Sequence, residues 1–147
     1  MIRAQETARA ISEPHRLSAT LYDGLRSVKY GSWEGQSETE VAQQDPEAFR
    51  LYLEQIERFR FSRGETLDDL RQRAVGVLEE GIRTHPGEHI VLVTHQVVTR
   101  VLLCAVLGVD NSLYWRLGQD PGCINRVEWE GVTYRLQGMN WVPQESL

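Results

Sequence analysis

Three side chains in this sequence have the types and positions needed to hold a phosphate-like anion. His95 follows an apolar, β-branched run and precedes a helical pattern, so it lies where helix-end amide groups and the helix dipole favour an anion. Arg3 stands near the start of one helical pattern and Arg100 about one turn into another, and a guanidinium can bond two phosphate oxygens at once. The same positions also suit a histidine satisfied by backbone groups and two solvated arginines, so the pattern alone leaves both interpretations open.

The segments on either side of His95 predict a buried strand followed by a helix. Residues 89–94 read His-Ile-Val-Leu-Val-Thr, a run typical of a strand covered on both faces of a parallel sheet. A helix is predicted from Gln96 to about Leu107. The pattern favours an α/β fold with helices packed on a mainly parallel sheet, in which ligands bind beyond the carboxyl ends of the strands. His95 occupies such an end.

The remaining segments predict further helices and a C-terminal pair of strands within a single domain. Capping patterns mark helix starts at Ser37, Asp45 and Thr66. The expected elements are helices over 3–12, from 37, over about 46–59, from 66 to before Pro86 and over 111–115, with strands over 18–25, 124–129 and 132–136. The sequence contains no internal repeat or low-complexity linker, so one domain is expected over residues 1–147.

Composition indicates a folded protein that recognises anions locally. Of the 147 residues, 41% are hydrophobic and 25% charged, as in ordinary globular domains. The net charge of −5 disfavours nonspecific binding to nucleic acid or anionic membranes, because such binding relies on clustered Lys and Arg. The longest apolar run, residues 97–109, is too interrupted to cross a bilayer, and the first residues carry no leader pattern. We therefore expect a cytoplasmic protein with no metal or other cofactor and no nucleic-acid or membrane partner.

Four motifs, in order along nearly the whole chain, resemble those of the histidine phosphatase (phosphoglycerate mutase-like) superfamily. They are Arg3-Ala4-Gln5-Glu6-Thr7-Ala8, Tyr30-Gly31-Ser32-Trp33-Glu34-Gly35, Gly64-Glu65-Thr66, and Val93-Thr94-His95 followed by Arg100. The glutamine at position 96, directly after His95, resembles the motif of the family branch that includes fructose-bisphosphatase domains. The resemblance implies a three-layer α/β fold, phosphoglycerate mutase-like, with a helical insertion over about residues 36–63.

The resemblance also implies a role for each matching residue. Arg3 would bind the phosphoryl group, and His95 would contact it and stabilise the charge that develops during transfer. Glu65 would orient or support this site, and Gln96 would contribute to phosphate binding. Such a positive, hydrogen-bonding cradle suits a trigonal phosphoryl transition state and needs no metal.

Two departures from the family pattern concern the transfer steps themselves. The family's nucleophilic histidine lies in an Arg-His-Gly motif after the first strand, and the 147 residues contain no Arg-His-Gly. The family pattern therefore implies that N-terminal strands are missing. A wrongly predicted start position, a fragment cut from a longer protein and a truly truncated protein would all give the same sequence. Ser27 stands where the family usually has a glutamate that protonates the leaving group, and a serine hydroxyl is a poor acid. Glu34 and Asp23 are the alternative acids.

The implied function is a phosphatase-type domain that acts on a small phosphorylated metabolite through a phosphohistidine, with little activity from this chain alone. Inorganic phosphate is an expected ligand. A phosphoglycerate mutase and a noncatalytic phosphate-binding or scaffold domain remain alternatives, although the compact stretch 36–63 and the Thr94-His95-Gln96 signature favour hydrolysis. Missing central strands would leave the edges of neighbouring strands without hydrogen-bond partners. A homodimer or a domain-swapped arrangement would cover these edges; without either, the fold would be less stable.

Overall fold

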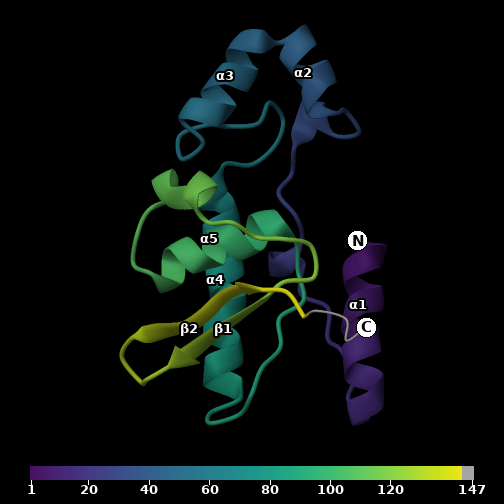
Figure 1. Ribbon diagram of the computed structural model, residues 1–147, viewed down its shortest axis with the longest axis vertical. Coiled ribbons are helices and arrows are strands. Elements are labelled where there is room, and N and C mark those ends of the chain that lie inside the picture. Colours follow the sequence, from purple (N-terminus) through teal and green to yellow (C-terminus); the bar gives the residue numbers. More distant parts are fainter. Residues whose placement is uncertain (144–147) are drawn as a thin grey trace.

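The computed structural model describes residues 1–143 as helices, short 3-10 turns and one hairpin (Figure 1). The α-helices are α1 (Ile2–Ser12), α2 (Glu38–Gln44), α3 (Pro46–Glu54), α4 (Leu67–Thr84) and α5 (Gln96–Val106). The 3-10 turns are η1 (Glu13–His15), η2 (Asp23–Leu25), η3 (Gly31–Trp33) and η4 (Asn111–Arg116), and the strands are β1 (Ile124–Trp129) and β2 (Tyr134–Trp141). No helix among these residues is both long and apolar enough to cross a membrane.

The three predicted helix starts are confirmed, because each has the capping contacts that its sequence indicated. The Ser37 hydroxyl accepts the Glu40 N–H while the Glu40 carboxylate accepts the Ser37 N–H, which forms a capping box on α2. Asp45 caps α3 in front of Pro46. Thr66 caps α4 through the same reciprocal arrangement with Asp69. Side-chain oxygens thus satisfy amide groups that the first helical turn leaves without partners.

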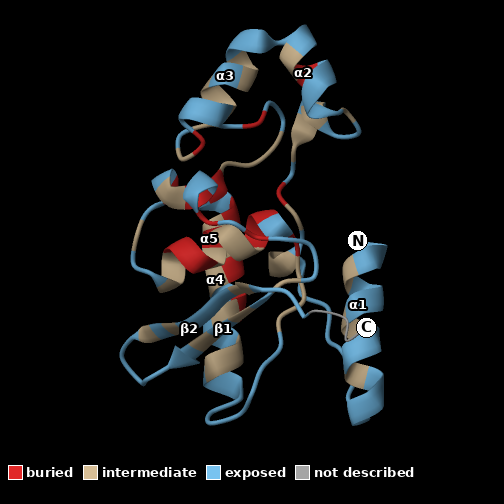
Figure 2. Ribbon diagram, viewed as in Figure 1, coloured by how far each residue is buried: buried red, intermediate tan, exposed pale blue. Residues whose placement is uncertain are grey.

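The hydrophobic core lies between α4 and α5 and extends towards the loop that precedes α4. Leu70 and Ala74 of α4 and Val98 and Val101 of α5 are fully buried. Figure 2 shows most of the buried positions on these helices and on η4 and others on α2 and on loops, whereas α1 carries none. Helices α2 and α3 pack against each other at the far end of the molecule from η1 (Figure 1).

The expected strand over residues 89–94 is extended but unpaired, so that prediction is wrong. Residues 89–94 form no backbone hydrogen bond with any other described residue, and Ile90 and Val91 are 41% and 67% exposed. The short strand expected over 18–25 is likewise absent, because residues 18–21 are unpaired and Asp23–Leu25 form a 3-10 turn. A β-strand requires a neighbour for its amide and carbonyl groups, and β-branched composition alone does not supply one.

The paired strands within residues 1–143 form an antiparallel hairpin, not the parallel sheet that the sequence favoured. Trp129 pairs with Tyr134 beside the turn, and pairing continues to Ile124 opposite Trp141. The second strand therefore begins and ends later than the predicted 132–136. Helix α3 ends at Glu54, before the expected end near residue 59, because Gln55 adopts a non-helical backbone conformation. Ile56, which follows the helix, is nevertheless buried in the core. The α/β composition itself is confirmed.

Candidate anion site

The start of α1 and the start of α5 bring Arg3 and His95 together. Arg3 Nη2 lies 3.5 Å from His95 Nδ1, at the long end of the hydrogen-bond range. His95 is the N-cap of α5, and its carbonyl accepts both the backbone N–H and the hydroxyl of Thr99. The predicted pair, separated by 92 positions in the sequence, therefore meets at a helix N-terminus, where amide groups favour an anion.

The environment of His95 favours its neutral form. Burial lowers the pKa of His95, and the positive charge of Arg3 lowers it further. Because a guanidinium can only donate, Nδ1 accepts the contact from Arg3 and the ring proton resides on Nε2. The imidazole can therefore donate from Nε2 to an anion oxygen without carrying a full charge itself.

Glu65 supports the loop around the site and is fully engaged in doing so. Its carboxylate accepts two hydrogen bonds from Arg73, at 2.8 and 3.1 Å, and a third from the Lys29 backbone N–H at 3.0 Å. Burial would raise the pKa of Glu65, but the hydrogen bonds and charges of Arg73 and Lys29 outweigh it and lower the pKa. Arg73 also donates to the carbonyls of Gly24, Arg26 and Ser27. Glu65 is thus placed to position this loop.

Two glycines from the recognised motifs allow the loop that carries Lys29 and Tyr30 to pack against the loop before α4. A Cβ on Gly64 would lie 2.1 Å from the Lys29 carbonyl oxygen, and a Cβ on Gly31 would lie 2.0 Å from the Ser62 carbonyl oxygen. Gly31 also has a φ of +58°, which L side chains rarely adopt. The close approach permits the hydrogen bonds Glu65 N–H to Lys29 O and Ser32 N–H to Ser62 O.

Gln96 and Arg100 are directed away from the Arg3–His95 pair. The Gln96 amide donates to the Gln119 carbonyl. Arg100 Nε donates to the Leu117 carbonyl at 2.9 Å, and its guanidinium lies 5.0 Å from the ring centre of Tyr114. Arg100 is therefore not brought to His95 as the spacing suggested, and the phosphate-binding role of Gln96 stays a prediction.

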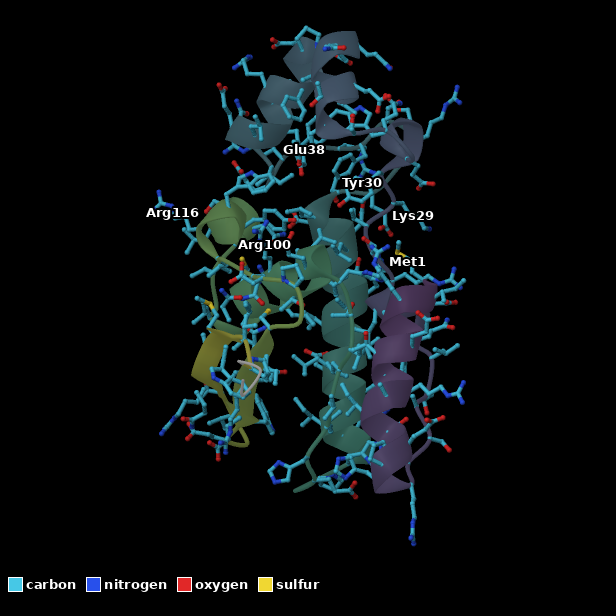
Figure 3. All side chains as sticks on the ribbon, turned by 45° about the vertical axis from the view of Figure 1, so that its right-hand side comes forward. Met1, Lys29, Tyr30, Glu38, Arg100 and Arg116 are labelled. Carbon is cyan, nitrogen blue, oxygen red and sulfur yellow. The ribbon has the colours of Figure 1, made fainter. Side chains whose placement is uncertain are left out.

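A cavity of about 1100 Å³ begins at Arg3 and extends under α2 and α3. Its lining includes Lys29, Tyr30, Glu38 and Ser27, and Figure 3 places Glu38, Tyr30, Lys29 and Met1 in succession from α2 down to α1. Sequence reasoning missed Lys29, Tyr30 and Glu38 as site residues. The only available signal was that Lys29 and Tyr30 adjoin the Gly31-containing motif, since nothing local places α2 over them.

The proton donor for a leaving group remains unassigned by the geometry. Ser27 lines the cavity, and Asp23 pairs with Arg26 at 2.9 Å. Glu34 lines the cavity together with these residues. Within residues 1–143 no group of three or more His, Cys, Asp or Glu side chains lies together in a way that could hold a metal ion. Independence from metal stays a prediction.

Comparisons with known proteins agree with the motif resemblance. Residues 1–142 match the sequence profile of the histidine phosphatase superfamily (branch 1). Phosphoserine phosphatase 1 of Hydrogenobacter thermophilus is 34% identical over 128 residues, which make up 87% of this chain and 61% of that protein. The chain thus spans about three fifths of the length of this curated relative.

Solved structures show the same fold. YhfR of Bacillus stearothermophilus superimposes with a TM-score of 0.86 at 28% identity, over 92% of this chain and 67% of that one. A mycobacterial glucosyl-3-phosphoglycerate phosphatase, solved with inorganic phosphate, gives a TM-score of 0.84 at 22% identity over 95% and 73% of the two chains. These matches confirm the phosphoglycerate mutase-like α/β class, although the described strands of this chain form only the hairpin.

Proposed function

Because this chain belongs to the histidine phosphatase superfamily, we propose that Arg3 and His95 form the phosphoryl-binding centre of a phosphatase acting on a small phosphorylated metabolite. The observation that carries the proposal is the 3.5 Å approach of Arg3 to His95 at the N-terminus of α5. Names of similar proteins, among them phosphoserine phosphatase and α-ribazole phosphatase, point to the same reaction class.

In the proposed mechanism, phosphate oxygens replace the weak direct contact between the two side chains. The Arg3 guanidinium donates to two oxygens, and His95 donates to a third from Nε2. Both donors act on the equatorial oxygens, where negative charge is spread during phosphoryl transfer. A histidine nucleophile attacks phosphorus while the bond between phosphorus and the ester oxygen breaks, and that oxygen takes up a proton as the alcohol leaves. Water then attacks the phosphohistidine, which releases inorganic phosphate and frees the histidine. No Arg-His-Gly motif is present in the 147 residues, so we expect this chain to bind phosphate esters and to turn them over slowly.

A noncatalytic phosphate-binding role is the second candidate, and Ser27 favours it. Ser27 lines the cavity, and its hydroxyl is too weak an acid to offer a leaving group a ready proton. Binding of phosphate without release from a phosphate ester would support this candidate. Exchange of a phosphate between two positions of one metabolite would instead support a mutase.

The binding part of the proposal is tested by titrating inorganic phosphate or vanadate into the protein, with calorimetry or NMR as the readout. We expect saturable binding that Arg3→Ala weakens by at least about tenfold, because a charge-assisted bidentate contact is lost. Arg9→Ala is the matched control, since Arg9 lies on the same helix and forms its ion pair with Glu13, away from His95. Absence of a saturable site, or equal weakening by both substitutions, would contradict the proposal.

A further inference from the structure

The cavity beside Arg3 has an aromatic wall at the end covered by α2 and α3. Trp33, Phe49 and Tyr52 line it, with ring centres 5.4 Å apart for Trp33 and Tyr52 and 6.4 Å apart for Trp33 and Phe49. Each of these rings is half-buried, and Tyr30 continues the wall towards the anion site. Ring faces carry negative electrostatic potential and therefore attract organic cations.

Glu38 adds a full negative charge to this wall. It lies in the first turn of α2, is exposed, lines the cavity and forms no ion pair among residues 1–143. Capping of α2 does not require it, because Ser37 and Glu40 already provide the capping box. The charge of Glu38 also acts on Tyr30. Burial is the largest cause that raises the pKa of Tyr30, and the negative charge of Glu38 is the next largest.

The two ends of the cavity carry opposite charges. Arg3 and Lys29 line one end, and neither forms an ion pair within the described part of the chain. Tyr30 lines the same cavity; its pKa, raised chiefly by burial, is raised further by the charge of Glu38 and lowered by the charges of Arg100 and Arg3. Figure 3 shows the order from Glu38 through Tyr30 to Lys29. A ligand matched to this arrangement carries an anion at one end and a cation at the other.

We propose that the substrates of this site are phosphate monoesters of amino alcohols, with the phosphate at Arg3 and His95 and the ammonium group against Glu38 and the aromatic wall. This inference rests on the proposed function and specifies its substrate class. The cavity of about 1100 Å³ is ample for a small ester of this kind; Arg3 lines it, whereas His95 is not among its lining residues and lies 3.5 Å from Arg3. Arg100 is not among the described residues that line the cavity and is held by Leu117 and Tyr114, although its positive charge acts on Tyr30 and Tyr52 and lowers the pKa of both.

The test compares two isosteric probes that differ in one charge: phosphocholine, and 3,3-dimethylbutyl phosphate, in which carbon replaces the quaternary nitrogen. Inorganic phosphate reports on the anion site alone. We expect phosphocholine to bind roughly tenfold more tightly than its neutral isostere, the size of effect expected for a partly desolvated charge contact. In NMR spectra, the indole resonance of Trp33 should shift with phosphocholine and stay in place with inorganic phosphate.

Glu38→Gln should reduce the preference for phosphocholine to the part that the aromatic wall supplies, while leaving the affinities for the neutral isostere and for inorganic phosphate unchanged. Glu80→Gln, which removes the same charge from an exposed position on α4 outside the cavity, is the matched control and should have no effect. Equal affinities for the two isosteres, or a preference that is undiminished in Glu38→Gln, would overturn the inference. In that case Arg3-dependent phosphate binding would leave the proposed function standing. If none of the three probes bound, both proposals would fall.

Discussion

At the scale of single residues, neighbouring groups determine the protonation state of His95 and the hydrogen bonds that Glu65 accepts. His95 is useful as a donor because burial and Arg3 keep its ring neutral and leave Nε2 protonated. Glu65 is useful as a support because Arg73 and the Lys29 amide occupy its oxygens. In the proposed mechanism His95 contacts the phosphate, whereas Glu65 acts through the loop that it holds.

The coupling of Arg3 to His95 predicts the direction of a titration shift. Removal of the positive charge in Arg3→Ala should raise the pKa of His95, because that charge disfavours the imidazolium. The pKa should stay below its ordinary value, since burial, the largest cause, remains. NMR titration of the His95 ring measures the shift, and Arg9→Ala provides the control. A pKa of His95 that is unchanged or lower in Arg3→Ala would show that the two side chains are not in contact in solution.

The same shift has a consequence for stability against pH. A histidine with a lowered pKa binds its proton less readily when folded than when unfolded, so the free energy of unfolding falls as the pH drops below the unfolded value of about 6.5. The loss continues until the folded pKa is reached. Above about pH 7 the ring is neutral in both states and the dependence vanishes.

At the scale of elements, local signals predicted the helices well and the strands poorly. Ser37, Asp45 and Thr66 each start a helix because the capping partner lies three residues away in the sequence. Residues 89–94 have the composition of a buried strand, yet pairing depends on a distant neighbour that composition does not reveal. The site follows the same rule: His95 was marked by its place at a helix start, whereas Glu38 becomes a site residue only through the placement of α2.

The contact between the loop before α4 and the loop carrying Lys29 predicts a severe effect of Gly64→Ala. The new Cβ would lie 2.1 Å from the Lys29 carbonyl oxygen and 2.7 Å from Phe61 Cβ, so the loops must separate, at a cost of about 3 kcal/mol. Gly76→Ala is the matched control, because a Cβ there has no neighbour within 4 Å and α4 should gain up to about 1 kcal/mol. Urea unfolding followed by circular dichroism measures both. Equal stability of the two variants would contradict the packing described here.

At the scale of the whole molecule, distant segments build one site while other apolar segments remain uncovered. The cavity draws on α1, on the loop from Asp23 to Gln36, on α2 and α3, and on α4. Outside it, several large apolar side chains are exposed on α1 and on the two unpaired extended segments, namely Ile2, Ile11, Leu17, Leu21, Ile90 and Val91. A homodimer that covers some of them stays a prediction, as does the role of residues 36–63 as an insertion. In the proposed function, phosphate binding requires Arg3 and His95, whereas turnover also requires a nucleophile and a proton donor.

That difference predicts slow hydrolysis of an aryl phosphate by residues 1–147 despite measurable phosphate binding. Of the four histidines, only His95 lies beside Arg3; His15 sits in η1, and His85 and His89 are exposed beyond the end of α4. If His95 attacked phosphorus itself, its charge-stabilising contact would be lost, and Ser27 supplies the leaving group with no proton. Loss of a nucleophile commonly lowers the rate by a factor of about a million, leaving only the effects of binding and electrostatics. Steady-state release of the aryl alcohol, together with ³¹P NMR for phosphohistidine, measures this directly, with His15→Ala as the control for His95→Ala. Rapid turnover that His95→Ala abolishes and His15→Ala preserves would show that His95 is itself the nucleophile.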